Sequence, residues 1–371
     1  MTFADAPDFA LERYFAQWEF AVKHQLSASD VEPFTLTELL ALADDDARRR
    51  WDALTLGYTE SSGLPALREE IARQFQSLSP RDVVVVAGAE EGIFLLMHSL
   101  VGAGDEVVVV TPSYQSLHEL PRSLGARVHL VPLTAANRWE LDPEDVARVV
   151  SSRTRLIIVN FPHNPTGALI PEATLQRLVT IADRCGATLF SDEVYRGLEA
   201  NPATRLSAAA DLSGRAVSLG VMSKSFALPG LRIGWVATRN ADLLSRIARL
   251  KDYTTICSSA PSEILALVAL RASGRVLQRS RDIVAANREA AEAFMIRHQE
   301  LIDWIPPRAG STAFPCFRDR DADVVATALR ERESVLMVPG RLFGADPRHF
   351  RLGLGRRDLP SALDSLSRVL S

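Results

Sequence analysis

Short apolar runs alternate with longer helical patterns between about residue 80 and residue 240, and this alternation is the strongest constraint on the fold. Several runs are apolar throughout, as expected of strands in a sheet that is covered on both faces. Helical patterns at residues 91–101, 171–185 and 242–251 separate many of the runs. We therefore expect an α/β protein whose large domain has three layers, α/β/α, around a mainly parallel sheet. The predicted strands are residues 83–86, 106–110, 128–131, 156–159, 188–191, 216–221 and 233–237.

The pattern changes near residue 255, where the chain becomes helical before a mixed α/β tail. The elements predicted there are helices at residues 262–273 and 276–301 and strands at residues 312–317, 336–338 and 350–354. This change predicts a second, smaller α/β domain. We expect three parts, namely an N-terminal segment (residues 1–45) that packs on the small domain and the active site, a large domain (residues 46–260) and a small C-terminal domain (residues 261–371).

Composition argues against several classes of protein. The 371 residues carry a net charge of −4 without a long run of one sign, so a nucleic-acid partner is not expected. The N-terminus is acidic where a signal peptide is basic, and no segment approaches the 18 or so apolar residues of a membrane span. We expect a cytoplasmic protein without a membrane partner.

The metal-binding residue types are scattered. Cys185, Cys257 and Cys316 are far apart, with no CxxC motif, and the seven histidines are dispersed along the chain. This spacing predicts reduced thiols and no metal site.

Polar residues, Gly and Pro gather directly after the predicted strands. Open α/β sheets bind ligands at the carboxyl ends of their strands, so these positions predict the functional site. They are residues 88–90, 111–114, 160–167, 192–195 and 223–224.

Three side chains at these strand ends suggest a cofactor. Lys224 follows the run at residues 216–222, Asp192 follows another strand, and Tyr195 stands three residues later. An amine to form an imine, an acid to pair with a pyridinium nitrogen and a donor to a ring phenolate are what pyridoxal 5′-phosphate (PLP) chemistry requires.

Three motifs resemble those of the class I and II aminotransferases, which are fold-type I PLP enzymes. They are SKSFALPGLRIGW at residues 223–235, NFPHNPTG at residues 160–167 and SDEVY at residues 191–195, in the order and spacing of that family. The similarity extends from about Tyr58 to Arg351. It implies a PLP-dependent aminotransferase that acts on an L-amino acid and forms a homodimer with shared active sites.

The resemblance assigns the chemistry to four residues. Lys224 would form the Schiff base and carry the proton between the substrate α-carbon and C4′ of the cofactor. Asp192 would pair with the pyridine nitrogen, and keeping that nitrogen protonated makes the ring an electron sink. Tyr195 and Asn164 would hydrogen-bond the ring O3′, and Asn164 would also line the substrate site.

A second group would bind the cofactor phosphate. Arg232, the Ser223 hydroxyl and the backbone amides of Ala89 and Glu90 are suitable donors. Two positions depart from the family pattern, because Val221 and Glu90 stand where small or hydroxyl residues are usual.

Three further residues are matched by the resemblance. Tyr114 would stack on the pyridine ring, and Tyr58 would reach the phosphate of the neighbouring subunit. Arg351 would hold the substrate α-carboxylate with its two-pronged guanidinium.

The reaction itself stays open between transamination and a second alternative. A more specific resemblance is to capreomycidine synthase-like PLP enzymes, which cyclise a hydroxylated arginine. It rests on ERYF at residues 12–15, His163, Ala313 to Pro315 and Val338 to Gly344. For such a guanidino substrate, Glu12 is the expected carboxylate partner. A non-catalytic PLP-binding regulatory module is the third alternative.

Overall fold

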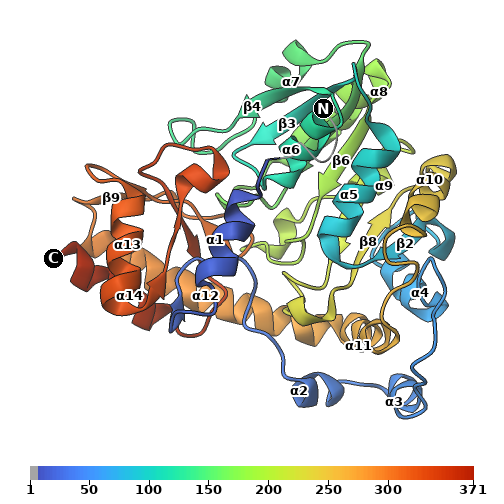
Figure 1. The fold of residues 1–371 in the computed structure, drawn as a ribbon, viewed down its shortest axis with the longest axis horizontal. Helices are drawn as coiled ribbons and strands as arrows, with labels where there is room; N and C mark the ends of the chain where they lie inside the picture. The colour runs from blue at the N-terminus through green and yellow to red at the C-terminus, as the bar shows by residue number, and fades with distance from the viewer. Residues whose placement is uncertain (1–6) are drawn as a thin grey trace.

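The central sheet contains all seven predicted strands. A computed structural model describes residues 7–371, and in this part of the chain one seven-stranded sheet has the order β2-β8-β7-β6-β5-β3-β4 (Figure 1). Neighbouring strands are parallel except β8, which is antiparallel to both β2 and β7. The mainly parallel sheet is therefore confirmed. Its strands are β2 (Val83–Val86), β3 (Glu106–Thr111), β4 (Arg127–Pro132), β5 (Thr154–Asn160), β6 (Thr188–Asp192), β7 (Val217–Val221) and β8 (Gly234–Ala237).

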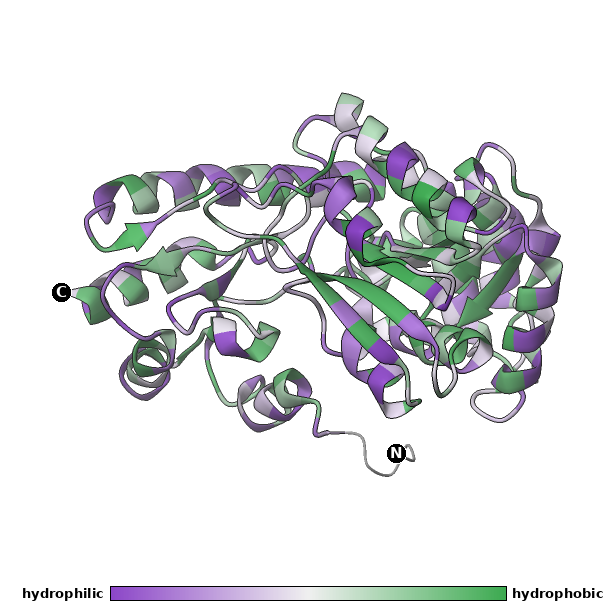
Figure 2. Cartoon of the chain, turned by 90° about the horizontal axis from the view of Figure 1, so that it is seen from above, coloured by the Kyte–Doolittle hydropathy of each residue, from purple (hydrophilic) through white to green (hydrophobic). Residues whose placement is uncertain are grey.

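Helices cover both faces of this sheet, because its strands alternate apolar side chains between two cores. Val107 and Val109 pack in one cluster with α5, α6 and α10, whereas Val108 and Val110 pack in the opposite cluster with α7 and α8. The apolar strands are enclosed by helices in the hydropathy view (Figure 2). The three-layer prediction is confirmed. The helices around the sheet are α4 (Pro65–Ala72), α5 (Gly88–Leu100), α6 (Ser116–Ser123), α7 (Pro143–Val149), α8 (Glu172–Cys185), α9 (Ala209–Leu212), α10 (Ala241–Lys251) and α11 (Ala260–Arg271).

The C-terminal part has a hydrophobic cluster of its own, which includes Phe294, Phe317 and Leu366. Here the predicted strand at residues 312–317 is split in two, since Pro315 has no amide to continue a ladder. The elements are α12 (Ser273–Arg297), β9 (Ile302–Asp303), β10 (Thr312–Ala313), β11 (Cys316–Phe317), α13 (Ala322–Glu333), β12 (Val335–Leu336), β13 (Val338–Pro339), β14 (Phe350–Gly353) and α14 (Leu359–Leu370). Short 3₁₀ helices are η2 (Pro80–Asp82), η3 (Pro202–Thr204), η4 (Pro229–Leu231) and η5 (Gly340–Phe343).

The N-terminal segment lies against the C-terminal part. It contains α1 (Ala10–Trp18), β1 (His24–Gln25) and α2 (Leu36–Leu40), and α3 (Asp45–Asp52) begins at its end. Strand β1 pairs with β12, and the Tyr14 hydroxyl donates to the Met337 carbonyl at 2.9 Å. Helix α11 packs against α2, α3 and α4, beside the sheet. The domain boundaries at residues 45 and 260 stay predictions.

Within residues 7–371, no helix combines the length and the apolar character needed to cross a membrane.

The packing of the N-terminal segment on β14 depends on Gly353. A Cβ atom at this position would overlap the backbone carbonyl of Ala28, which cannot move as freely as a side-chain tip. We expect Gly353→Ala to lower the free energy of unfolding by about 1–3 kcal/mol, the usual cost of overpacking. Chemical denaturation measures this loss. Gly214→Ala is the control, because an added Cβ there meets nothing within 4 Å, and an equal loss in both variants would contradict the prediction.

Candidate active site

The carboxyl ends of β5 and β6 are held together by one amide side chain. Register pairs Asn160, the last residue of β5, with Asp192, the last residue of β6. The Asn160 side-chain nitrogen donates to the Asp192 carbonyl at 2.9 Å, and its oxygen accepts from the Asn164 amide at 2.8 Å. The two strand ends and the following loop are thereby fixed to one another.

The carboxyl group of Asp192 is buried where it can meet a cation. The residue is 6% exposed, and one carboxylate oxygen accepts from the Val194 amide at 3.2 Å. Burial raises the pKa of Asp192 to about 7, against the opposing effect of that amide and of the Lys224 charge. A protonated ring nitrogen placed beside it would favour the carboxylate form.

Lys224 lies in the loop after β7, close enough for its charge to act on Asp192. Its Nζ donates to the Ser29 hydroxyl at 2.8 Å. Ser29 belongs to the N-terminal segment, so the lysine lies between the sheet edge and that segment.

Tyr195 is buried with an unused hydroxyl. The side chain is 2% exposed, and its Oη has no hydrogen-bond partner among residues 7–371. An unsatisfied hydroxyl at this depth is costly unless a ligand pairs with it. Tyr195 therefore has a donor available for an acceptor oxygen such as O3′ of PLP.

Arg351 on β14 is a buried guanidinium that also keeps a free donor. It is 1% exposed, and it donates to the Ser27 carbonyl at 3.0 Å and to the Asn164 side-chain oxygen at 3.3 Å. The Phe15 and Phe343 rings lie 5.7 and 5.2 Å from its central carbon. Burial lowers its pKa, and Nη2 has no partner within the described chain. A carboxylate would satisfy this group.

The predicted phosphate donors meet at the start of α5. This helix begins at Gly88, earlier than predicted, and Gly88 has a positive φ of 80°, which glycine adopts readily. A Cβ there would overlap the Arg232 guanidinium, which also donates to the Ser223 hydroxyl at 3.4 Å. The first-turn amides, including those of Ala89 and Glu90, have no helical acceptor, as at many anion sites.

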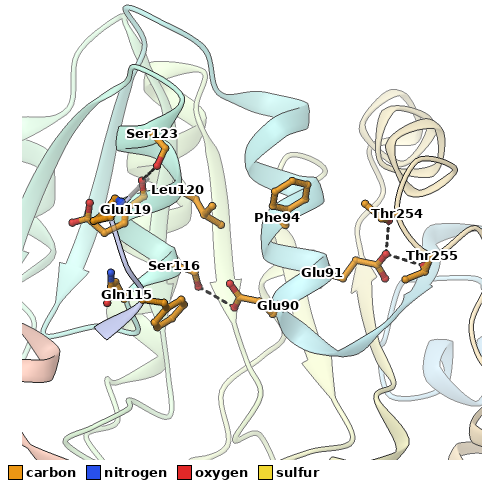
Figure 3. Close-up of a pocket in the computed structure, with 12 residues that line it drawn as sticks. Glu90, Glu91, Phe94, Gln115, Ser116, Glu119, Leu120, Ser123, Thr254 and Thr255 are labelled. Carbon is orange, nitrogen blue, oxygen red and sulfur yellow. Dashed lines mark hydrogen bonds between the residues drawn. The ribbon is translucent and has the colours of Figure 1, made fainter. Parts of the chain in front are cut away.

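The Glu90 side chain points toward Ser116 on α6 (Figure 3). It accepts from the Ser116 hydroxyl at 3.1 Å, and burial raises its pKa to about 7. Together with Glu91, which accepts from Thr254 and Thr255 at 2.5 and 2.8 Å, it lines a cavity of about 500 Å³ (Figure 3). This cavity adjoins the predicted phosphate site.

Tyr114 and Glu12 form a pair across the site. The Tyr114 hydroxyl donates to the Glu12 carboxylate at 2.6 Å, and the Phe9 ring lies 4.9 Å from the tyrosine ring. Burial, followed by the charges of Glu90 and Glu12, raises the pKa of Tyr114 well above its usual value. Tyr114, which was predicted to stack on the cofactor, thus forms a hydrogen bond with Glu12, which was predicted to bind the substrate side chain.

Two of the predicted site residues are exposed, Arg232 and Tyr58. The Tyr58 side chain is 92% exposed on the loop before α4. Val221, in contrast, is buried as the last residue of β7.

Several polar residues of the site were not predicted. Ser27, Ser29 and Ser116 contact site residues, but no local pattern distinguishes them from other serines. Asn160 lies within the predicted site range of residues 160–167, but the connection that its side chain makes between two strand ends was not predicted.

The donor set fits PLP. The unsatisfied Tyr195 hydroxyl and the buried Asp192 suit its ring, and Arg232 with the start of α5 suits its phosphate. The Lys224 amine suits the aldehyde of the cofactor. No group of three or more His, Cys, Asp or Glu side chains suited to a metal occurs in residues 7–371.

Comparison with known proteins identifies relatives of the whole chain. The family model "Aminotransferase class I and II" matches residues 30–364. Capreomycidine synthase from Streptomyces vinaceus is 34% identical over 98% of this chain and 94% of the synthase. An arginine–pyruvate transaminase from Pseudomonas aeruginosa is 30% identical over 91% of this chain and 90% of the transaminase. The solved structure of the PLP-dependent cyclase OrfR has a TM-score of 0.90 at 32% identity, covering 98% of this chain and 97% of the cyclase.

The raised pKa of Asp192 predicts a pH-dependent stability. Its folded pKa of about 7 lies above the unfolded value near 3.8, so the stability penalty grows as pH rises from about 4 to 7 and is complete above that range. In the cofactor-free protein, Asp192→Asn should therefore raise the free energy of unfolding more at pH 8 than at pH 5, by on the order of 2 kcal/mol. Tm should rise more at pH 8 for the same reason. Thermal unfolding at both pH values tests this. The exposed Asp242→Asn is the control, and a pH-independent effect of Asp192→Asn would refute the prediction.

Proposed function

The chain belongs to the class I and II aminotransferases, and from this membership we propose that it transfers the amino group of an L-amino acid to a keto acid. It is a PLP-dependent enzyme with the fold-type I architecture. When bound, PLP supplies an electron sink that makes loss of the substrate α-proton possible. The observation that carries the proposal is the buried Arg351 guanidinium, which has an unpaired donor that a substrate carboxylate would satisfy.

The side chains divide the work in this proposal. Arg351 binds the α-carboxylate, and Asn164 keeps the guanidinium in place through its 3.3 Å hydrogen bond. Lys224 removes the α-proton and returns it, since its amine lies in the same site. Asp192 pairs with the ring nitrogen, and Tyr195 donates to the ring oxygen.

A second copy of the chain would complete the site. Tyr58 is too exposed to be explained by packing within one chain, and an aromatic side chain on a loop is suited to insertion into a partner. We therefore keep the predicted homodimer, with Tyr58 reaching the phosphate site of the partner subunit. The cytoplasmic location stays a prediction.

Cyclisation of a guanidino amino acid is the second candidate. The Glu12 carboxylate lies 2.6 Å from the Tyr114 hydroxyl, and Glu90 adds a second acidic group that acts on the same tyrosine. Two carboxyl groups close to one tyrosine suit a cationic substrate side chain. Two relatives support this candidate by name, the synthase and the cyclase, while the transaminase name specifies arginine. A guanidino substrate is thus compatible with both reactions.

Lys224 provides the first test of the proposal. The purified protein with PLP should absorb near about 420 nm, as an imine of this cofactor does, and Lys224→Ala should lose that band because it has no amine to join the aldehyde. Lys251→Ala is not a suitable control, since that lysine is buried, so the exposed Lys23→Ala is used. A parent protein without the band contradicts the assignment.

The two reactions are separated by their need for an acceptor. Conversion of the cofactor to its amine form by an amino acid, reversed by a keto acid, identifies a transaminase. Product formed from a hydroxylated arginine without any keto acid identifies a cyclase.

Glu12 is expected to select cationic substrates. Glu12→Gln keeps the size of the side chain but removes its charge, so kcat/KM for arginine-like amino acids should fall by about 10- to 100-fold, the size of a charged hydrogen bond. The value for apolar amino acids should change little. Glu69→Gln on the exposed face of α4 is the control, and an unchanged ratio between the two substrate classes would rule out the role of Glu12.

A further inference from the structure

The Lys224 amine has a specific partner that comes from a distant part of the chain. Its Nζ donates to the Ser29 hydroxyl at 2.8 Å, although 195 residues separate the two. A free lysine side chain has many rotamers, and one well-placed acceptor favours those that keep the amine near it.

Ser29 is itself held in place on two sides. Its carbonyl accepts from the Ser311 hydroxyl at 2.7 Å. The preceding residue, Ala28, lies so close to Gly353 that no side chain would fit between them. These contacts hold the backbone on both sides of the Ser29 side chain in place.

We propose that Ser29 is a positioning residue for Lys224. Its hydroxyl holds the free amine at the carboxyl edge of the sheet, within reach of the charge of Asp192. With PLP bound, an amine in this position would join the cofactor aldehyde with loss of one water molecule. After a substrate amine has displaced it, the same lysine amine would take the α-proton from the substrate. This role of Ser29 rests on the proposed function, because it requires that Lys224 reacts with PLP.

The test follows how fast the amine joins the cofactor. Cofactor-free protein is mixed with PLP, and the growth of the band near about 420 nm is recorded. Ser29→Ala should slow this growth by about three- to tenfold, the size of one net hydrogen bond. Affinity for pyridoxamine 5′-phosphate, measured by calorimetry, should not change, because that compound carries no aldehyde and forms no bond with Lys224.

Ser225→Ala is the matched control. Ser225 is the next residue to Lys224, and its buried hydroxyl donates to the Val194 carbonyl at 3.2 Å and not to the amine. It should join PLP at the rate of the parent protein. Equal slowing in both variants, no slowing in Ser29→Ala, or a parallel loss of pyridoxamine phosphate affinity would overturn the role of Ser29. If instead the parent protein forms no band with PLP, the proposed function fails.

Discussion

The site depends on one side-chain amide at the end of the sheet. Asn160 donates to the backbone of Asp192 and accepts from the backbone of Asn164, so two strand ends and a loop share one rigid connection. Asn164 in turn accepts from Arg351 on β14, in a different part of the chain. A parallel sheet ends all its strands at one edge, and this amide turns that edge into a fixed frame for charged groups.

Three buried polar groups at this edge of the sheet lack sufficient partners within the described chain. Arg351 keeps a donor without a partner in the described chain, Tyr195 keeps its hydroxyl, and Asp192 has a pKa near 7. Such groups reduce the stability of the empty protein. In the proposed function, a substrate carboxylate, the ring oxygen of PLP and its protonated ring nitrogen would supply the missing partners.

The strands and their polar ends could be predicted because the information is local. Lys224, Asp192 and Tyr195 each follow an apolar run, and a parallel sheet brings such positions to one edge. Contacts with the N-terminal segment could not be derived in this way. The Glu12–Tyr114 and Ser29–Lys224 hydrogen bonds join residues 102 and 195 positions apart, and they depend on how the segment packs on β12 and β14. Tyr58 is harder still, since its predicted partner is in another copy of the chain.

Helix α1 is attached to both parts of the molecule. Near its start, the Ala10 amide donates to the Gln115 side chain, and farther along, Tyr14 donates to the Met337 carbonyl. Glu12 lies between these attachments. Under the proposed roles, cofactor chemistry depends on the sheet edge and the choice of substrate side chain on helix α1, and separate stretches of the gene encode the two. Changes around the codon for Glu12 would then alter the preferred amino acid while the lysine and the aspartate at the sheet edge stay as they are.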